Sequence, residues 1–162
     1  ARDRGAIIYY DVNFRAAHAD EVMKLTPNIL ENFEYADIVR GSRDDFNVMY
    51  RMDTPDKVYT SQVSFYCKKF VYTDGANAVE LRGDGGLRKS YPVTATENMS
   101  TIGAGDNFNA GLVYGLMKYG VTRDMMDGAI PEQTWDSIIR CALAFPANCC
   151  KSIGNSIDTA VS

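Results

Sequence analysis

The segment STIGAGDNFNAGL, from Ser100 to Leu112, places two glycines one residue apart and follows them with a carboxylate at the start of an amphipathic helix. Gly103 and Gly105 let backbone N–H groups turn toward one point at a helix N-terminus, where the dipole is worth about half a positive charge. Such a turn can hold an anion. A carboxylate would repel a resting phosphate. Asp106 is therefore better explained as a general base that takes a proton from an alcohol during phosphoryl transfer.

Two common phosphate-binding motifs do not match this segment. A P-loop ends in Gly-Lys-Ser/Thr, whereas Asp106 follows the second glycine here. A dinucleotide fingerprint requires a preceding strand and a third glycine, and Phe108 stands in that place, which disfavours an oxidoreductase on a dinucleotide fold. A structural alternative stays open, in which Asp106 is only a first-turn carboxylate favoured by the helix dipole and Gly103 is a turn residue.

The elements that would position this segment begin with a strand–helix–strand unit. Strands are predicted at residues 6–10 and 35–41, each ending at a turn or polar residue. The sequence between them is helical, with Thr26 as the expected N-cap of its second part and Pro27 at the first helical position. This order favours an α/β sheet with mainly parallel pairing, whose ligand sites lie beyond the carboxyl ends of the strands.

The rest of the chain continues the alternation. A helix from Ser42 is predicted, then a strand that ends at Gly75, then a hairpin over residues 77–93 that turns at GDGG. A helix from Ala104 follows, and its core face carries Phe108, Leu112, Leu116 and Tyr119. The last predicted helix runs from Thr134 to Ser152, and Pro146 should kink or split it. No repeat or low-complexity linker interrupts the chain, so residues 1–162 are expected to form part of one domain.

The composition excludes several classes of partner. With 46% hydrophobic and 23% charged residues the chain is ordinary for a globular domain, and its net charge of -4 argues against a nucleic-acid or anionic-membrane partner. No apolar run approaches the roughly 20 residues of a membrane span, and the start does not resemble a signal peptide. We expect a cytoplasmic protein.

Four segments, in order along the chain, resemble the ribokinase-like (PfkB) carbohydrate kinases. STIGAGDNFNAGL resembles the C-terminal signature of that family, and DVNFR resembles its strand-end Asp-x-Asn-x-Arg. YTDGANAVEL is similar to its Thr-x-Gly nucleotide loop with the following hairpin, and ALAFPANCC to the late helix beside the adenine. YADIVRGSRDDF resembles fructokinase-like members. The resemblance implies a three-layer ribokinase-like α/β sandwich, of which this chain is the C-terminal, nucleotide-binding and catalytic-base portion.

The resemblance also implies roles for individual residues. Asp106 would be the base that deprotonates the sugar hydroxyl. The backbone of Gly103, Ala104 and Gly105 would form the anion hole around the γ-phosphate. The cofactor-binding residues would be Thr73 and Gly75 beside the nucleotide, Asn148 near the adenine or ribose, and Asn13 on the phosphate side of the cleft. Arg15, on the same side, would contact the substrate or its phosphate. Structural alternatives stay open for three of them: a turn cap for Asn13, a solvated charge for Arg15 and a plain strand residue for Thr73.

The chain departs from the family at its metal motif. The family has Asn-x-x-Glu after the second strand, and the matching place here is Ser42 to Asp45; the literal Asn-x-x-Glu at 28–31 lies inside a helix and is a coincidence. Ser42 and Asp45 also resemble a capping box, which is the stronger interpretation. We therefore assign no direct metal contact to Ser42 or Asp45, and Mg²⁺ would come with the ATP phosphates.

Members of the family are nearly twice this length, so the resemblance implies that an N-terminal half with a small β lid is missing. That half would hold most sugar-binding residues, and the full-length protein could be a homodimer. The leading hypothesis is an ATP-dependent sugar kinase, with fructose ahead of ribose and 2-keto-3-deoxygluconate, and the fragment alone inactive or weak. The alternative is a non-catalytic nucleotide- or sugar-binding module of the same fold, motivated by the altered residues 42–45.

Overall fold

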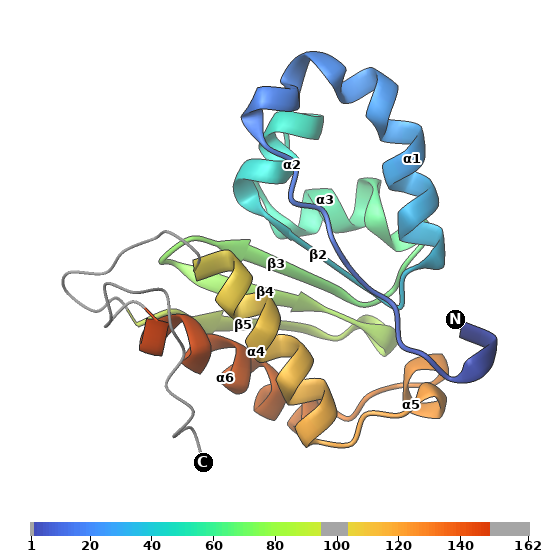
Figure 1. Ribbon diagram of the computed structural model, residues 1–162, viewed down its shortest axis with the longest axis vertical. Coiled ribbons are helices and arrows are strands. Elements are labelled where there is room, and N and C mark those ends of the chain that lie inside the picture. Colours follow the sequence, from blue (N-terminus) through green and yellow to red (C-terminus); the bar gives the residue numbers. More distant parts are fainter. Residues whose placement is uncertain (1, 95–103, 150–162) are drawn as a thin grey trace.

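The computed structural model describes residues 2–94 and 104–149. Within them it contains one five-stranded sheet, and Figure 1 labels four of its strands, β2 to β5. The strands lie in chain order: β1 (Tyr9–Asp11), β2 (Ile38–Ser42), β3 (Phe70–Asp74), β4 (Ala78–Arg82) and β5 (Arg88–Pro92). The first three pair in parallel and the last two add by antiparallel pairing, so the sheet is mixed. The predicted parallel pairing is found between β1, β2 and β3, and the predicted hairpin forms the antiparallel strands β4 and β5.

Helices cover both faces of the sheet and complete three layers (Figure 1). One face carries α1 (Val22–Tyr35), α2 (Arg43–Tyr50) and α3 (Pro55–Ser61), and the other carries α4 (Ala104–Lys118), α5 (Arg123–Asp127) and α6 (Glu132–Cys149). Short 3-10 turns occupy Arg2–Arg4, Ala16–Glu21, Val63–Phe65 and Asp84–Gly86. The α/β sandwich that the sequence predicts is confirmed. Among the described residues, no helix has the length and apolar character needed to cross a bilayer.

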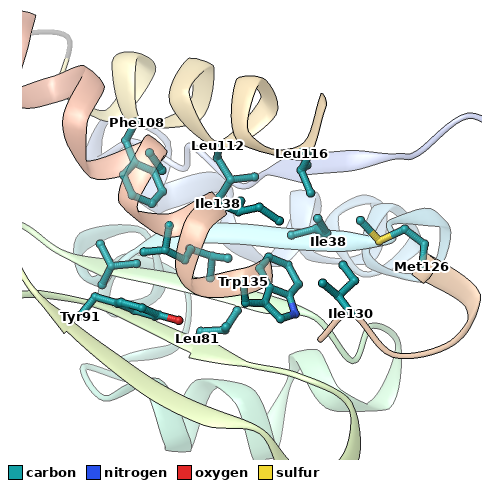
Figure 2. Packing of buried hydrophobic residues seen from close by; sticks show 14 residues of the cluster. Ile38, Leu81, Tyr91, Phe108, Leu112, Leu116, Met126, Ile130, Trp135 and Ile138 are labelled. Atoms are coloured by element: carbon teal, nitrogen blue, oxygen red, sulfur yellow. The ribbon is translucent and has the colours of Figure 1, made fainter. Parts of the chain in front are cut away.

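Alternation along the strands divides the core in two. In β2, Ile38 faces the α4 and α6 layer while Val39 faces the α1 to α3 layer, as expected for successive residues of a strand. Figure 2 shows the α4 side, where Phe108, Leu112 and Leu116 of α4 point toward the sheet beside Trp135 of α6. Tyr119 was predicted on this buried face, but it lies just after α4 and is 40% exposed.

Helices α4 and α6 pack at backbone contact. A Cβ added at Gly111 would lie 2.8 Å from the Ala142 Cα, and one at Gly115 would lie 3.1 Å from the Ile138 Cα. The glycines therefore let the two helices approach more closely than side chains would permit. This contact holds α4, which begins in the glycine-rich segment, firmly over the sheet.

The start of α1 differs from the prediction. Thr26 does not cap the helix; its hydroxyl donates 2.7 Å back to the Val22 carbonyl, and Pro27 lies inside the helix. Pro27 has no N–H to donate to the Met23 carbonyl, so the helix lacks one intrahelical hydrogen bond at this position. The preceding 3-10 turn starts the helical path earlier than the N-cap signal implies.

One other helix prediction needs correction, and two short helices were not predicted. The helix predicted from Thr134 begins at Glu132, and Pro146 does not split it, since α6 runs on to Cys149 as one element; a kink at Pro146 stays a prediction. Helices α3 and α5 were not predicted, since each is short, and α5 is only five residues long. The helix after Ser42 and the hairpin are confirmed.

Candidate active site

The carboxyl ends of β1, β2 and β3 meet at one edge of the sheet. Asp11 of β1 is the register partner of Arg40 in β2, and Ser42 is the partner of Thr73 in β3. The N-terminal end of α4 reaches the same edge, because Gly105 in its first turn lies next to Arg40, and Phe108 and Asn109 in its second turn contact Arg40 and Asp11. Strand ends and a helix N-terminus therefore converge where ligands of α/β sheets commonly bind.

Arg40 lies at the centre of this edge and is only 7% exposed. Its Nη1 donates to Asp11 Oδ1 at 3.0 Å and its Nη2 donates to Thr73 Oγ1 at 2.7 Å. The guanidinium carbon also lies 5.8 Å from the centre of the Phe108 ring. Its Nε is buried and has no hydrogen-bond partner among the described residues. A buried charge requires such partners, because removing it from water is costly.

Asp11 extends this arrangement to α4. Its second oxygen, Oδ2, accepts a 2.7 Å hydrogen bond from Asn109 Nδ2, and Asn109 Oδ1 accepts one of 2.7 Å from the Tyr9 hydroxyl. Burial raises the pKa of Tyr9, with smaller opposing and reinforcing effects from Arg40 and Asp11, so this phenol stays protonated as a donor. One hydrogen-bonded chain thus runs through Tyr9, Asn109, Asp11, Arg40 and Thr73.

The first turn of α4 presents Asp106 to solvent beside this series of hydrogen-bonded side chains. Asp106 is exposed and lies three residues before Asn109, so the two side chains emerge on the same side of the helix. Gly105 lies next to Arg40: a Cβ added there would be 3.7 Å from Nη2. An exposed carboxylate, a helix start whose first N–H groups have no intrahelical acceptor, and a buried guanidinium therefore share one small region, which can accept a proton and stabilise an anion.

The other predicted residues fall in different places. Thr73 is 8% exposed and its hydroxyl accepts from Arg40, whereas Gly75 lies in an exposed turn with a φ of 50°. Asn13 is exposed with a φ of 40°. Gly103 and the side chain of Asn148 lie outside the described residues, although Asn148 belongs to α6. The nucleotide roles of these residues stay predictions.

Arg15 lies in a separate hollow on the α2 side of the edge. The hollow measures ≈ 420 Å³ and is also lined by Phe14, Asp44, Asp45 and Asn47. Arg15 itself is exposed. Its positive charge shares the space with two carboxylates, and its assignment to the phosphate side stays a prediction.

Ser42 and Asp45 form the capping box that the sequence suggests. Asp45 Oδ2 accepts the Ser42 N–H and the Ser42 hydroxyl, each at 2.6 Å, and the Asp45 N–H donates to Ser42 Oγ at 3.2 Å. Asp45 is 7% exposed. In the part of the chain that the structure describes, no cluster of three or more His, Cys, Asp or Glu residues could hold a metal ion. Asp45 Oδ2 is thus engaged in the cap of α2, and the doubt about a direct Mg²⁺ contact by Ser42 or Asp45 stays a prediction.

Sequence reasoning missed Tyr9, Arg40 and Asn109. Arg40 carried a usable signal, because a charged residue inside the apolar strand DIVRG must be paired if the strand is buried. Asn109 follows Asp106 at helical spacing, but nothing in the sequence identifies Asp11 as its partner. That contact joins residues 98 positions apart.

Comparison with known proteins agrees with this fold. The profile of the pfkB family carbohydrate kinases matches residues 1–159. Two curated relatives, the 5-dehydro-2-deoxygluconokinases of Geobacillus kaustophilus (strain HTA426) and Geobacillus thermodenitrificans (strain NG80-2), are each 28% identical over 156 residues, which is 90% of this chain and 45% of theirs.

Solved structures show the same architecture. Fructokinase from Vibrio cholerae O395, in a form with fructose, ADP and calcium ion bound, superposes with a TM-score of 0.76 at 21% identity over 95% of this chain and 47% of that one. Aminoimidazole riboside kinase from Salmonella enterica gives 0.72 at 22% identity over 92% and 47%. The chain spans about half the length of the relatives it matches. With almost its whole length matched, the chain belongs to the pfkB family of carbohydrate kinases.

Proposed function

We propose that the protein containing this chain transfers the γ-phosphoryl group of ATP to a hydroxyl of a small sugar or sugar acid. The observation that carries this proposal is the exposed carboxylate of Asp106 in the first turn of α4, beside the carboxyl ends of the parallel strands. A base at a helix N-terminus combines proton acceptance with a positive dipole end, which is what transfer to an alcohol requires.

In the proposed step, Asp106 takes the proton of the substrate hydroxyl as the hydroxyl oxygen bonds to the γ-phosphorus. The bond from that phosphorus to the bridging oxygen breaks, and ADP leaves with the electron pair. The N–H groups of Ala104 and Gly105, together with Gly103, act as the anion hole for the transferring group. These N–H groups belong to the start of α4, where helical N–H groups have no intrahelical partner.

ATP is proposed as the donor because the resemblance implies it and because related kinases have been solved with nucleotide bound. Fructokinase from Xylella fastidiosa was solved with ATP, at 19% identity and a TM-score of 0.76 over 96% of this chain. Thr73, Gly75, Asn13 and Asn148 remain the proposed nucleotide contacts. No step is assigned to Mg²⁺, since Ser42 and Asp45 are engaged with each other.

The substrate is proposed as one of four compounds. The first to test is 5-dehydro-2-deoxygluconate, because the curated relatives that match 90% of this chain are named for it. Fructose follows, since the chain resembles fructokinases in sequence and in fold. Ribose and 2-keto-3-deoxygluconate come next. In the family the sugar-binding half lies outside the portion that this chain resembles, so we expect the isolated chain to be weakly active or inactive.

The test is sugar-dependent release of ADP by the intact protein with ATP and each of the four compounds. Release with one of them, and formation of its phosphate ester, supports the kinase. Binding of ATP or sugar without release in every reaction would instead favour the alternative, a non-catalytic binding module of the same fold.

A further inference from the structure

Arg40 places a charge that is only 7% exposed at the carboxyl ends of the parallel strands. Arg40 joins three strands, since it belongs to β2 and bonds Asp11 of β1 and Thr73 of β3. Buried ion pairs add little stability over apolar residues of similar size. Such a pair is better explained by what it holds in place.

The element held in place is the first turn of α4. Asp11 uses one oxygen for Arg40 and the other for Asn109, so its carboxylate is fixed from both sides. Asn109 lies one turn after Asp106, and Phe108 between them lies against the guanidinium. Asp11 is therefore connected through Asn109 to α4 at a point one turn after Asp106.

Arg40 also balances charge at this edge. The Asp11 side chain is 20% exposed, and without Arg40 its negative charge would face the region into which the phosphoryl group is proposed to bind. The guanidinium approaches Gly105 closely enough for a Cβ there to contact both Nη atoms, at 3.7 and 3.9 Å. The Nε without a partner leaves the guanidinium incompletely paired by its protein neighbours.

We propose that Arg40 is a positioning residue: through Asp11 and Asn109 it holds the first turn of α4 in place for phosphoryl transfer, and its charge offsets that of Asp11. The part of this inference that concerns catalysis rests on the proposed function. The part that concerns the position of α4 rests only on the contacts of Arg40, Asp11 and Asn109.

The experiment compares Arg40→Met, Arg40→Lys and Asn109→Ala in the intact protein with a matched control, Arg82→Met. Arg82 is also a buried arginine, 5% exposed, with ion pairs to Asp56 and Glu80. It lies beside Phe70 at the opposite end of β3. Arg82→Met should thus remove a comparable ion pair without touching the edge that carries Asp106.

In steady-state kinetics, Arg40→Met should lower kcat by about 10²-fold with little change in the KM for ATP, since small displacements of catalytic groups have effects of this size. Arg40→Lys should recover part of the loss because it restores the charge. Asn109→Ala should lower kcat while leaving the ion pair intact, and Arg82→Met should keep the wild-type kcat. Hydrogen exchange of amides 107–112 should accelerate in Arg40→Met and Asn109→Ala beyond any change in Arg82→Met.

The outcomes separate the two proposals. If wild-type protein releases no ADP with any of the four compounds, the proposed function fails, and the exchange data still decide whether Arg40 holds α4. If wild-type protein is active but Arg40→Met and Asn109→Ala keep its kcat, the positioning inference is overturned and the kinase stands. Equal loss of kcat in Arg82→Met would also overturn it, because the loss would then reflect general destabilisation.

Discussion

Asp11 and Arg40 are register partners on adjacent parallel strands, and their side chains form a 3.0 Å ion pair at the edge where α4 begins. The pair joins residues 29 positions apart and continues through Asn109 to the helix turn that presents Asp106. Strand pairing and helix position are thus coupled at the candidate active site.

Replacing Asp106 with Asn should abolish most of the activity. Because a positioned general base contributes about 10²-fold to 10⁴-fold, kcat should fall by that factor while ATP still binds. The measurement is ADP release together with ATP titration of the intact protein. The control is Asp124→Asn, which removes another exposed first-turn aspartate, in α5, a helix that follows the opposite, C-terminal end of α4. Wild-type turnover in Asp106→Asn would remove this residue from the mechanism.

Replacing Gly105 with Ala should separate stability from activity. The new Cβ would meet Arg40 at an ordinary 3.7 Å, so the free energy of unfolding should not fall. If the backbone of this turn receives the phosphoryl group, the methyl group should narrow the anion hole and lower kcat. Urea unfolding and ADP release measure the two effects. Full activity with unchanged stability would show that the turn does not approach the phosphoryl group.

Replacing Gly111 with Ala should destabilise the protein, in contrast to Gly105→Ala. Its Cβ would lie 2.8 Å from the Ala142 Cα, and backbone cannot move aside as a flexible side chain can. We expect a loss of about 1–3 kcal/mol in the free energy of unfolding, as for other overpacked sites. Urea denaturation checks this value. A neutral result would mean that α4 and α6 separate easily.

Replacing Ser42 with Ala tests whether this position is structural. Loss of an N-cap hydroxyl typically costs about 0.5–2 kcal/mol, and Ser42 Oγ accepts the Asp45 N–H at 3.2 Å. The free energy of unfolding should fall by that amount, while the dependence of activity on Mg²⁺ concentration should stay that of wild type. A large rise in the Mg²⁺ concentration needed for half-maximal activity would instead make Ser42 part of metal handling.

Asp37 should make stability depend on pH in the acid range. Burial raises the pKa of its carboxyl, but hydrogen bonds from Arg123 and the Ile8 N–H and the charges of Arg123 and Arg2 outweigh this and lower the pKa. Because the Asp37 carboxyl has a lower pKa in the folded state than in the unfolded state, it stabilises the protein at pH values above its unfolded pKa of about 3.9. This contribution is lost as the pH falls through the pKa of the folded state.

Urea unfolding between neutral pH and the acid range can measure this effect. Wild-type protein should lose stability below about pH 4, and Asp37→Asn should lose less over the same interval because it has no proton to gain. Arg123 Nη1 donates to Asp37 Oδ2 at 2.7 Å, so the variant should also be less stable at neutral pH. Identical pH dependence in the two proteins would contradict the assignment.

Much of the architecture could be predicted because it follows from local patterns. The strands, the hairpin around GDGG and the capping box at Ser42 each depend on neighbouring residues. The hairpin and the capping box are confirmed, and strands occur at both predicted places, although the first covers Tyr9–Asp11 and the second Ile38–Ser42. The errors arose where local signals compete. Pro27 signals a helix start, but helical structure that begins before it outweighs that signal.

The sequence by itself determined the α/β class, the family resemblance and the glycine-rich helix start with its carboxylate, because each is written in adjacent residues or in helical and strand periodicity. Only the tertiary structure decided what surrounds that carboxylate. Tyr9, Arg40 and Asn109 come from three separate elements, and their hydrogen bonds exist only after the strands have paired and α4 has packed on the sheet. Contacts between distant residues depend on register and helix placement, which no local pattern specifies.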